Sequence, residues 1–401
     1  MVWPFNRRNL RTAGSLFAAT VAPPIALPAP PEIRFTFKLF RELARKDPSA
    51  NIFFSPCSVM LCLAMVCDGA SGETRDGMAK ALELSGLDAK GLEDAIAGLR
   101  SVLAAQGSGV QLLISNSLWC SQSIPVDAAF TARVHDIYDA EVHEIDFGAQ
   151  DASARINSWV SEKTARMIPQ IADGFNPLTL LVALNAIYFK GGWSEPFHRV
   201  FTREEPFTTG DGHRKPVPTM RQSGKFRYSE QAEFQAVVLP YAGKRISMYV
   251  LLPARESNLQ RLRDALGAGE WQVLTKKFDE TKGSVLFPRF KVNYSAALRG
   301  ALTNLGMERA FDHERAEFAG IRKPPPLVWI DEVLHKAVAE VNEEGTEAAA
   351  ATMSEMFGAS MERSRPEPHF EMVVDRPFLF LIRDESSGNI LFMGSVVDPT
   401  T

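Results

Sequence analysis

The pattern of apolar positions divides the chain into a helical first quarter and a strand-rich remainder. Residues 33–46 carry apolar side chains at helical spacing, which predicts an amphipathic helix. Asp47 ends this helix because the residue before a proline is pushed out of helical conformation. A second helix is expected after Ser55, with Pro56 at its first position, where a missing N–H matters least. Further helices follow to about residue 105.

Short β-rich runs replace this pattern in the rest of the chain. Six runs are interpreted as strands, and Tyr241-Ala242-Gly243-Lys244 supplies a turn between two of them. The expected strands are 110–119, 182–189, 237–239, 246–252, 284–292 and 328–333. Helices lead and strands dominate later, which predicts an α+β fold rather than an alternating α/β fold.

A segment near the C-terminus has a strand-like pattern although its composition favours a helix. Four consecutive alanines, residues 348–351, have the highest intrinsic helix propensity. Read with period 2, an uncharged face alternates with a face that holds both charges, Glu347 and Glu355. The uncharged face consists of Thr346, Ala348, Ala350, Thr352, Ser354, Met356 and Gly358. The segment therefore has no strong local preference for a strand, yet its pattern suits insertion between existing strands.

Composition and charge describe an ordinary globular chain. It has 401 residues, of which 45% are hydrophobic and 23% charged. No linker or internal repeat is evident after residue 32, so one large domain with a sizeable core is expected. The net charge of −4 and a pI near 6.1 argue against a general nucleic-acid binder. Since the sequence has no apolar run of roughly eighteen residues, no membrane span is expected.

The four cysteines are interpreted as small buried hydrophobic side chains. Cys57, Cys62 and Cys67 are spaced five apart on an expected helix, which turns neighbouring thiols away from each other, and Cys120 lies in a strand-like run. No Cys-x-x-Cys pair occurs. We therefore expect no disulfide scaffold, no metal site and no cofactor.

Residues 1–32 read as an N-terminal extension with two interpretations. Three arginines precede a modestly apolar stretch, residues 13–26, which is the charge order of a secretory signal. Pro23 and Pro24 break that stretch and no convincing cleavage site stands out, so a disordered extension is the alternative. An extracellular or periplasmic location is favoured, and a cytoplasmic one stays open.

Four motifs resemble those of the serpin family and occur in the family's order. They are the early helix segment 51–58, the central run 181–193, the hinge segment 341–352, and the C-terminal strands 375–383 with 390–394. The resemblance covers roughly residues 33–399 and implies a single domain there. It implies helices packed on a large central mixed β-sheet, with further sheets. An exposed reactive-centre loop is implied at about 343–368.

The resemblance also implies that a partner performs the covalent chemistry. A serine protease would attack a carbonyl of the loop and form an acyl-enzyme, and the cut loop would insert into the central sheet as a new strand. About a dozen new hydrogen bonds, with burial of the uncharged face, supply on the order of 10 kcal/mol. A protease's own stability is about 5–15 kcal/mol, so its distortion is energetically plausible. The chain is thus expected to be a monomeric inhibitor, not an enzyme, partnered by a serine protease in a covalent acyl complex.

The family's spacing from hinge to reactive bond places the scissile bond at Ala359–Ser360. Alanine there suits a protease with a small specificity pocket, of the elastase type. A register slip into residues 356–358 is the alternative. Arg363 and Arg365 suggest a trypsin-like target but lie too far along for a loop of normal length. The implied hinge consists of Glu343, Glu344, Gly345, Thr346, Glu347, Ala348, Ala349, Ala350, Ala351 and Thr352.

Two more groups match family positions where the sheet must open. Trp193 matches the tryptophan at the point where the loop first enters the sheet, with plain core packing as its alternative role. Arg289 matches a basic residue that pairs with a hinge glutamate, here Glu343; a surface pair of this kind is worth about 0–1 kcal/mol and would position the hinge. The buried polar residues implied beneath the sheet are Ser55, Ser58, Asn185 and His335. We expect these four to form a hydrogen-bond network.

Other functions find less support. The sequence has no Gly-x-Ser-x-Gly, His-Glu-x-x-His, Walker loop or Gly-x-Gly-x-x-Gly motif, so a hydrolase with an unrecognised triad has no supporting motif. A non-inhibitory serpin, acting as a carrier or chaperone, stays open, although the hinge departs little from the inhibitory pattern. A cross-class inhibitor of papain-like cysteine proteases also stays open.

Overall fold

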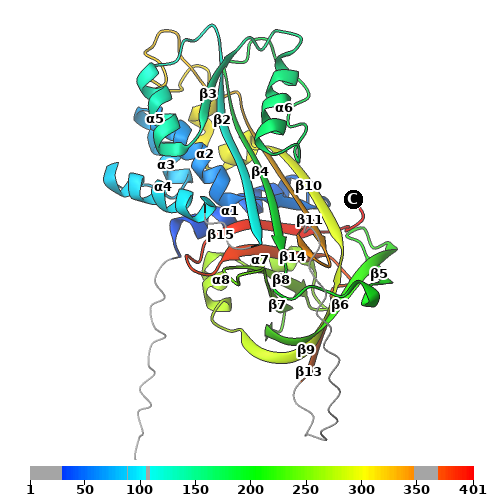
Figure 1. Ribbon diagram of the computed structural model, residues 1–401. Helices are drawn as coiled ribbons and strands as arrows, with labels where there is room; N and C mark the ends of the chain where they lie inside the picture. The colour runs from blue at the N-terminus through cyan, green and yellow to red at the C-terminus, as the bar shows by residue number, and fades with distance from the viewer. Residues whose placement is uncertain (1–28, 88, 105–108, 347–368) are drawn as a thin grey trace, which may run out of the picture.

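Helices lead the described chain and strands dominate after residue 180, which confirms the α+β class (Figure 1). The structure is a computed structural model that describes residues 29–87, 89–104, 109–346 and 369–401. Its helices are α1 (Pro31–Lys46), α2 (Pro56–Asp68), α3 (Gly72–Ala81), α4 (Ala89–Ala104), α5 (Ala128–Tyr138), α6 (Ala152–Lys163), α7 (Leu259–Ala265), α8 (Ala268–Leu274) and α9 (Arg299–Leu302). No helix of this described part combines the length and apolar character that a membrane crossing requires.

Within the described residues, six strands form a mixed sheet in the order β10-β11-β12-β4-β2-β3. They are β2 (Val110–Ser121), β3 (Glu141–Ile145), β4 (Leu181–Gly192), β10 (Phe290–Ala297), β11 (Glu332–Asn342) and β12 (Gly345–Thr346). β4 pairs antiparallel with β2 and parallel with β11. Figure 1 shows β2, β4, β11 and β10 running side by side through the middle of the molecule.

The side chains of β4 alternate between two apolar cores, which explains why this strand is almost continuously apolar. One face packs against α6 and consists of Val182, Leu184, Ala186 and Tyr188. The other face joins the core that includes α2 and consists of Leu181, Ala183, Ile187 and Phe189. Asn185 occupies the α2 face by the same alternation, so a polar side chain sits within an apolar layer.

A second sheet of nine strands, counted over the same described residues, lies beside the first (Figure 1). Its order is β1-β15-β14-β8-β7-β6-β9-β13, and β5 pairs with β6. The strands are β1 (Ile52–Phe54), β5 (Arg203–Thr208), β6 (Arg214–Glu230), β7 (Phe234–Pro240), β8 (Ile246–Pro253), β9 (Asp279–Pro288), β13 (His369–Val373), β14 (Phe378–Asp384) and β15 (Ile390–Val396).

The expected start of the second helix and the burial of the cysteines are confirmed, whereas the first helix begins at Pro31, two residues before the expected start. Pro31 opens α1, Pro56 opens α2, and the Ser55 side chain accepts a hydrogen bond from the N–H of Ser58 at the start of α2. All four cysteines are buried and free, and burial raises the pKa of the Cys62 and Cys120 thiols to about 12. They remain protonated core side chains at neutral pH.

Two strand predictions were wrong at their boundaries. The run 284–292 is not one strand, because the chain leaves β9 at Pro288 and enters β10 of the other sheet at Phe290. Between them, the N–H of Arg289 donates to Pro218 O at 2.8 Å. The run 328–333 becomes a strand only from Glu332: before it, the N–H of Ile330 donates to Ala310 O, outside the sheet, and the N–H of Asp331 donates to Leu181 O at the first residue of β4.

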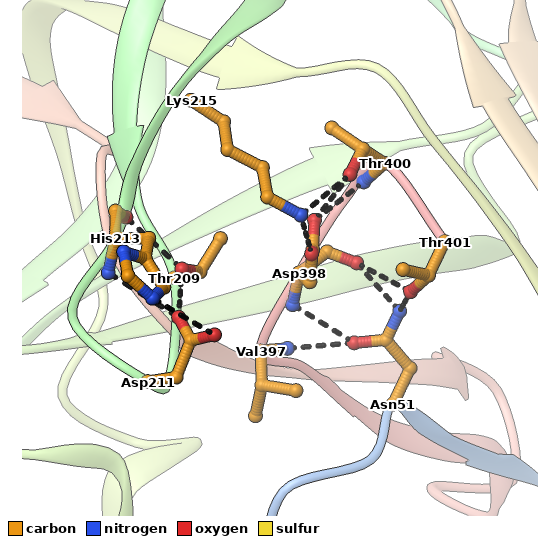
Figure 2. A network of polar contacts seen from close by, with 9 residues as sticks. All are labelled: Asn51, Thr209, Asp211, His213, Lys215, Val397, Asp398, Thr400 and Thr401. Carbon is orange, nitrogen blue, oxygen red and sulfur yellow. Dashed lines mark hydrogen bonds and ion pairs between the residues drawn. The ribbon is translucent and has the colours of Figure 1, made fainter.

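Polar contacts anchor the C-terminal residues near the second sheet (Figure 2). The Asn51 side-chain oxygen accepts from the N–H of Val397 at 2.7 Å and of Asp398 at 3.1 Å, while its amide donates to Asp398 O at 2.6 Å. Lys215 of β6 pairs with the Asp398 carboxylate. The chain terminus is thereby tied to β6, the strand whose Pro218 accepts the Arg289 N–H.

Candidate functional site

The candidate site is the place where the hinge enters the mixed sheet between β11 and β4. These strands pair directly from Glu332 with Val182 to Val338 with Tyr188. Beyond that point β12 lies between them, antiparallel to both. The third and fourth residues of the predicted hinge, Gly345 and Thr346, are therefore a strand of this sheet, next to the ladder in which β11 and β4 pair directly.

Gly345 is required at the point where the chain turns back from β11 into β12. Its φ of +147° is a conformation that side chains of L-residues rarely adopt. A Cβ added there would lie 2.1 Å from the carbonyl oxygen of Gly191 on β4. The entry of the hinge into the sheet thus depends on a missing side chain.

Thr346, the last described residue of the hinge, is fully buried, with an exposed fraction of 0%. Its hydroxyl lies 2.8 Å from the hydroxyl of Tyr241, in the turn between β7 and β8. The Tyr241 ring stacks on the indole of Trp193 with 4.6 Å between ring centroids. A charge at position 346 would be buried here without a partner.

Trp193 contacts the hinge through two hydrogen bonds. Its indole N–H donates to Asn342 O at 2.9 Å, and its backbone N–H donates to Glu344 O at 2.9 Å. The N–H of Phe197 donates to Glu343 O at 2.8 Å. Three consecutive carbonyls, those of residues 342–344 at the end of β11 and the start of the hinge, thus accept from the segment that follows β4, so Trp193 does more than pack in the core.

The Glu343 carboxylate is buried, with an exposed fraction of 2%, and binds Arg289 through two donors, one of them Nε at 2.9 Å. The Thr202 hydroxyl donates to the same oxygen at 2.5 Å. Burial alone would raise the pKa of Glu343, but these donors lower it below its ordinary value. The sequence interpretation as a surface ion pair was wrong on this point, because only Arg289, 41% exposed, reaches solvent.

A polar cluster, defined here as Ser58, Asn116, Asn185 and His335, lies beneath the direct β11–β4 ladder. Asn185 is its hub: its amide donates to Ser58 Oγ at 2.5 Å and to Asn116 Oδ1 at 2.6 Å, and its Oδ1 lies 2.6 Å from His335 Nδ1. The carbonyl oxygen requires a proton on His335 Nδ1, so Nε2 carries the lone pair. Ser55, predicted in this network, instead caps α2 and reaches it only through the N–H of Ser58.

His335 is neutral in this environment. The ring is buried, which lowers its pKa to about 3, and among the described residues its Nε2 has no hydrogen-bond partner. His335 and Asn185 are directly opposite each other in the ladder. A strand that enters between β11 and β4 must separate this pair.

The sequence analysis did not predict four residues of the site: Asn116, Tyr241, Thr202 and Arg199. Asn116 is placed in the cluster by the β2–β4 register, Tyr241 by a turn, and Thr202 and Arg199 by the chain after β4. Of these residues, only Asn116 could have been found from the sequence, because the alternation of side chains along β2 places it on a defined face of the sheet.

The remainder of the loop lies outside the described residues. Residues 347–352 of the hinge and the bond Ala359–Ser360 are not described. Within the described ranges, no three His, Cys, Asp or Glu side chains gather to hold a metal ion.

Comparison with known sequences identifies relatives over most of the chain. A family model described as Serpin (serine protease inhibitor) matches residues 32–399. The chain is 36% identical over 378 residues to the leukocyte elastase inhibitor of Bos taurus, covering 91% of this chain and 98% of that protein. It is 38% identical over 368 residues to an uncharacterized serpin-like protein of Thermococcus kodakarensis, covering 91% and 84%.

Solved structures share the fold. A thermophilic serpin, Tengpin, in its native state superposes with a TM-score of 0.85 at 28% identity, covering 92% of this chain and 93% of that chain. Thyroxine-binding globulin in complex with thyroxine gives a TM-score of 0.81 at 25% identity, covering 92% and 99%. The expected arrangement of helices on a mixed sheet is confirmed.

Proposed function

The chain belongs to the serpin family, and we propose that it inhibits serine proteases as a covalent trap that each molecule uses once. The family membership supports protease inhibition as the general function. The covalent mechanism, the target protease and the position of the reactive bond are what we propose here. In it, residues 33–399 are one monomeric domain that needs no cofactor, and residues 1–32 are an extension. The reactive-centre loop spans about 343–368.

The observation that carries this proposal is the position of β12. Gly345 and Thr346 pair with β4 on one side and β11 on the other, and β12 runs antiparallel to both, in the direction of the direct β11–β4 ladder. Thr346 begins the uncharged alternating face and is fully buried. Continued insertion would bury Ala348 and the other uncharged residues in turn while Glu347 and Glu355 face away.

The chemistry proceeds on the partner's serine. The serine oxygen bonds to the carbonyl carbon of Ala359, the bond to the Ser360 nitrogen breaks, and that nitrogen takes a proton. The acyl-enzyme stays attached to the inserting strand. Insertion forms about a dozen hydrogen bonds and buries apolar area. Together these contribute a free energy on the order of 10 kcal/mol. Separating His335 from Asn185 costs part of this.

Ala359 favours an elastase-type target because a small specificity pocket accepts its methyl group. The name of one relative, leukocyte elastase inhibitor, is consistent with this choice. The test is to mix the intact protein with pancreatic elastase and run a denaturing gel. We expect a band at the summed mass that survives boiling, and mass spectrometry is expected to place the cut after Ala359.

Two variants sharpen this test. Thr346→Arg places a charge where the hydroxyl now meets Tyr241, so the loop is expected to be cut without a stable complex. Glu347→Arg exchanges a charge on the outward face and is expected to keep the complex. Equal complex formation by both variants would contradict insertion along this face.

The alternative functions predict other outcomes. Clean loop cleavage without a complex, across serine proteases of elastase, chymotrypsin and trypsin type, indicates a non-inhibitory relative; one structural neighbour is a thyroxine complex, which keeps a carrier role open. A stable complex with papain, but with no serine protease, indicates cross-class inhibition through a thioester.

A further inference from the structure

We propose that the Tyr241 phenol is a positioning group that holds the hinge strand β12 in the sheet before any protease binds. The inference deepens the proposed function, because it concerns the starting state of the loop that the trap uses. Tyr241 would set the equilibrium between hinge strands that are in the sheet and hinge strands that have left it, before a protease binds.

The contact between the two hydroxyls is buried on both sides. Tyr241 and Thr346 each have an exposed fraction of 0%, and their oxygens are 2.8 Å apart. Among the described residues neither hydroxyl has another hydrogen-bond partner. Removal of one hydroxyl therefore leaves the other buried without a partner, which is costly as long as the hinge stays in the sheet.

The phenol stays in place when the hinge moves. Its ring is stacked on Trp193 and meets Phe189 edge-on, with 5.1 Å between those centroids. The backbone around it is also bonded: Tyr241 N–H donates to Ile246 O, and Ala242 N–H donates to Gly192 O. Because the phenol is fixed, Thr346 either reaches it or leaves it, which makes two discrete hinge states.

The test is a double-mutant cycle read by amide hydrogen exchange on the intact chain without protease. Tyr241→Phe and Thr346→Val each leave one buried hydroxyl unpaired. We expect each to raise the opening equilibrium of residues 341–346 about fivefold, the effect of losing one ordinary hydrogen bond. The double variant places two apolar groups in contact, so exchange is expected to return close to the original.

Two controls separate positioning from general loosening. Thr346→Ser keeps the hydroxyl and is expected to keep slow exchange at the hinge. Exchange in β3 and β14, away from the hinge and from the Tyr241 turn, is expected to be unchanged in all variants.

Unchanged hinge exchange in both single variants would overturn the proposal, and so would additive increases in the double variant. A rise at every strand together would also overturn it, because that is general destabilisation. Since no protease is present, these outcomes do not depend on whether a covalent complex forms with elastase. Failure of the trap and failure of this inference are therefore distinguishable.

Discussion

His335 Nδ1 lies 2.6 Å from Asn185 Oδ1 across the β11–β4 ladder, at the fourth of its seven residue pairs. The two side chains therefore join the strands that an inserting loop must separate. The same Asn185 also bonds Ser58 on α2 and Asn116 on β2. One amide thus links β11, β2 and α2 at this point of the sheet.

Asn185→Ala is expected to destabilise the native protein by about 2–4 kcal/mol, because it leaves several buried polar groups without their partner. Asn116→Ala is the matched control: it removes only one contact of the cluster and is expected to cost about 1 kcal/mol. Urea unfolding followed by circular dichroism measures both. Equal effects of the two substitutions would show that Asn185 is not the hub.

Acid is expected to weaken the native state through His335. Its native pKa is about 3 and lies below the ordinary value of 6.5, so protonation favours the unfolded chain. The contribution is complete above about pH 6.5 and is lost as the pH falls toward 3. At about pH 4.5 the loss amounts to roughly 2–3 kcal/mol.

His335→Gln provides the comparison, since glutamine has no proton to gain. Unfolding is measured for both proteins between pH 7.5 and about 4.5, and the difference between their curves isolates His335 from the carboxylates. The two curves should diverge below about pH 6.5. Parallel curves throughout would mean that His335 is not held neutral by burial.

Arg289→Met is expected to destabilise the protein by about 1–3 kcal/mol, because the buried Glu343 carboxylate then keeps only Thr202 as a side-chain donor. Lys291→Met, two residues further along on β10, is the matched control. The Lys291–Glu340 pair, at 3.3 Å, is exposed on both sides and is worth under about 1 kcal/mol. Thermal unfolding compares the two, and similar losses would contradict a special role for the buried carboxylate.

Gly345→Ala is expected to expel β12 from the sheet, because its Cβ would overlap the Gly191 carbonyl. Hydrogen exchange at residues 341–346 should rise at least tenfold. Gly86→Ala is the control: Gly86 also has a positive φ, of +85°, but a Cβ there meets no atom within 4 Å. A normal hinge in Gly345→Ala would show that the close approach to β4 is not required.

Local sequence signals predicted the elements whose patterns are strong. The apolar face of α1, the Ser55-Pro56 start of α2 and the continuous apolar run of β4 all agree with the structure. The break between β9 and β10 was missed because Pro288 and Arg289 interrupt a run whose β-rich character continues on both sides. A change of sheet is a tertiary event that strand propensity does not encode.

The site residues that belong to a sequence motif could be predicted. Those that come together only in the folded chain could not. Trp193, Asn185 and Glu343 belong to recognisable motifs. Tyr241 lies in a turn more than 100 positions before Thr346, and no spacing rule joins them. The burial of Glu343 was missed for the same reason, because Thr202 and Arg289 meet it only in the fold.

The proposed trap requires that the cleaved loop becomes a strand between β11 and β4. The most direct measurement is the thermal unfolding midpoint of the intact protein and of the same protein cut once within residues 353–364. Insertion adds hydrogen bonds and buried area, so the cut protein is predicted to unfold at a markedly higher temperature. A midpoint equal to or below that of the intact protein would contradict the claim.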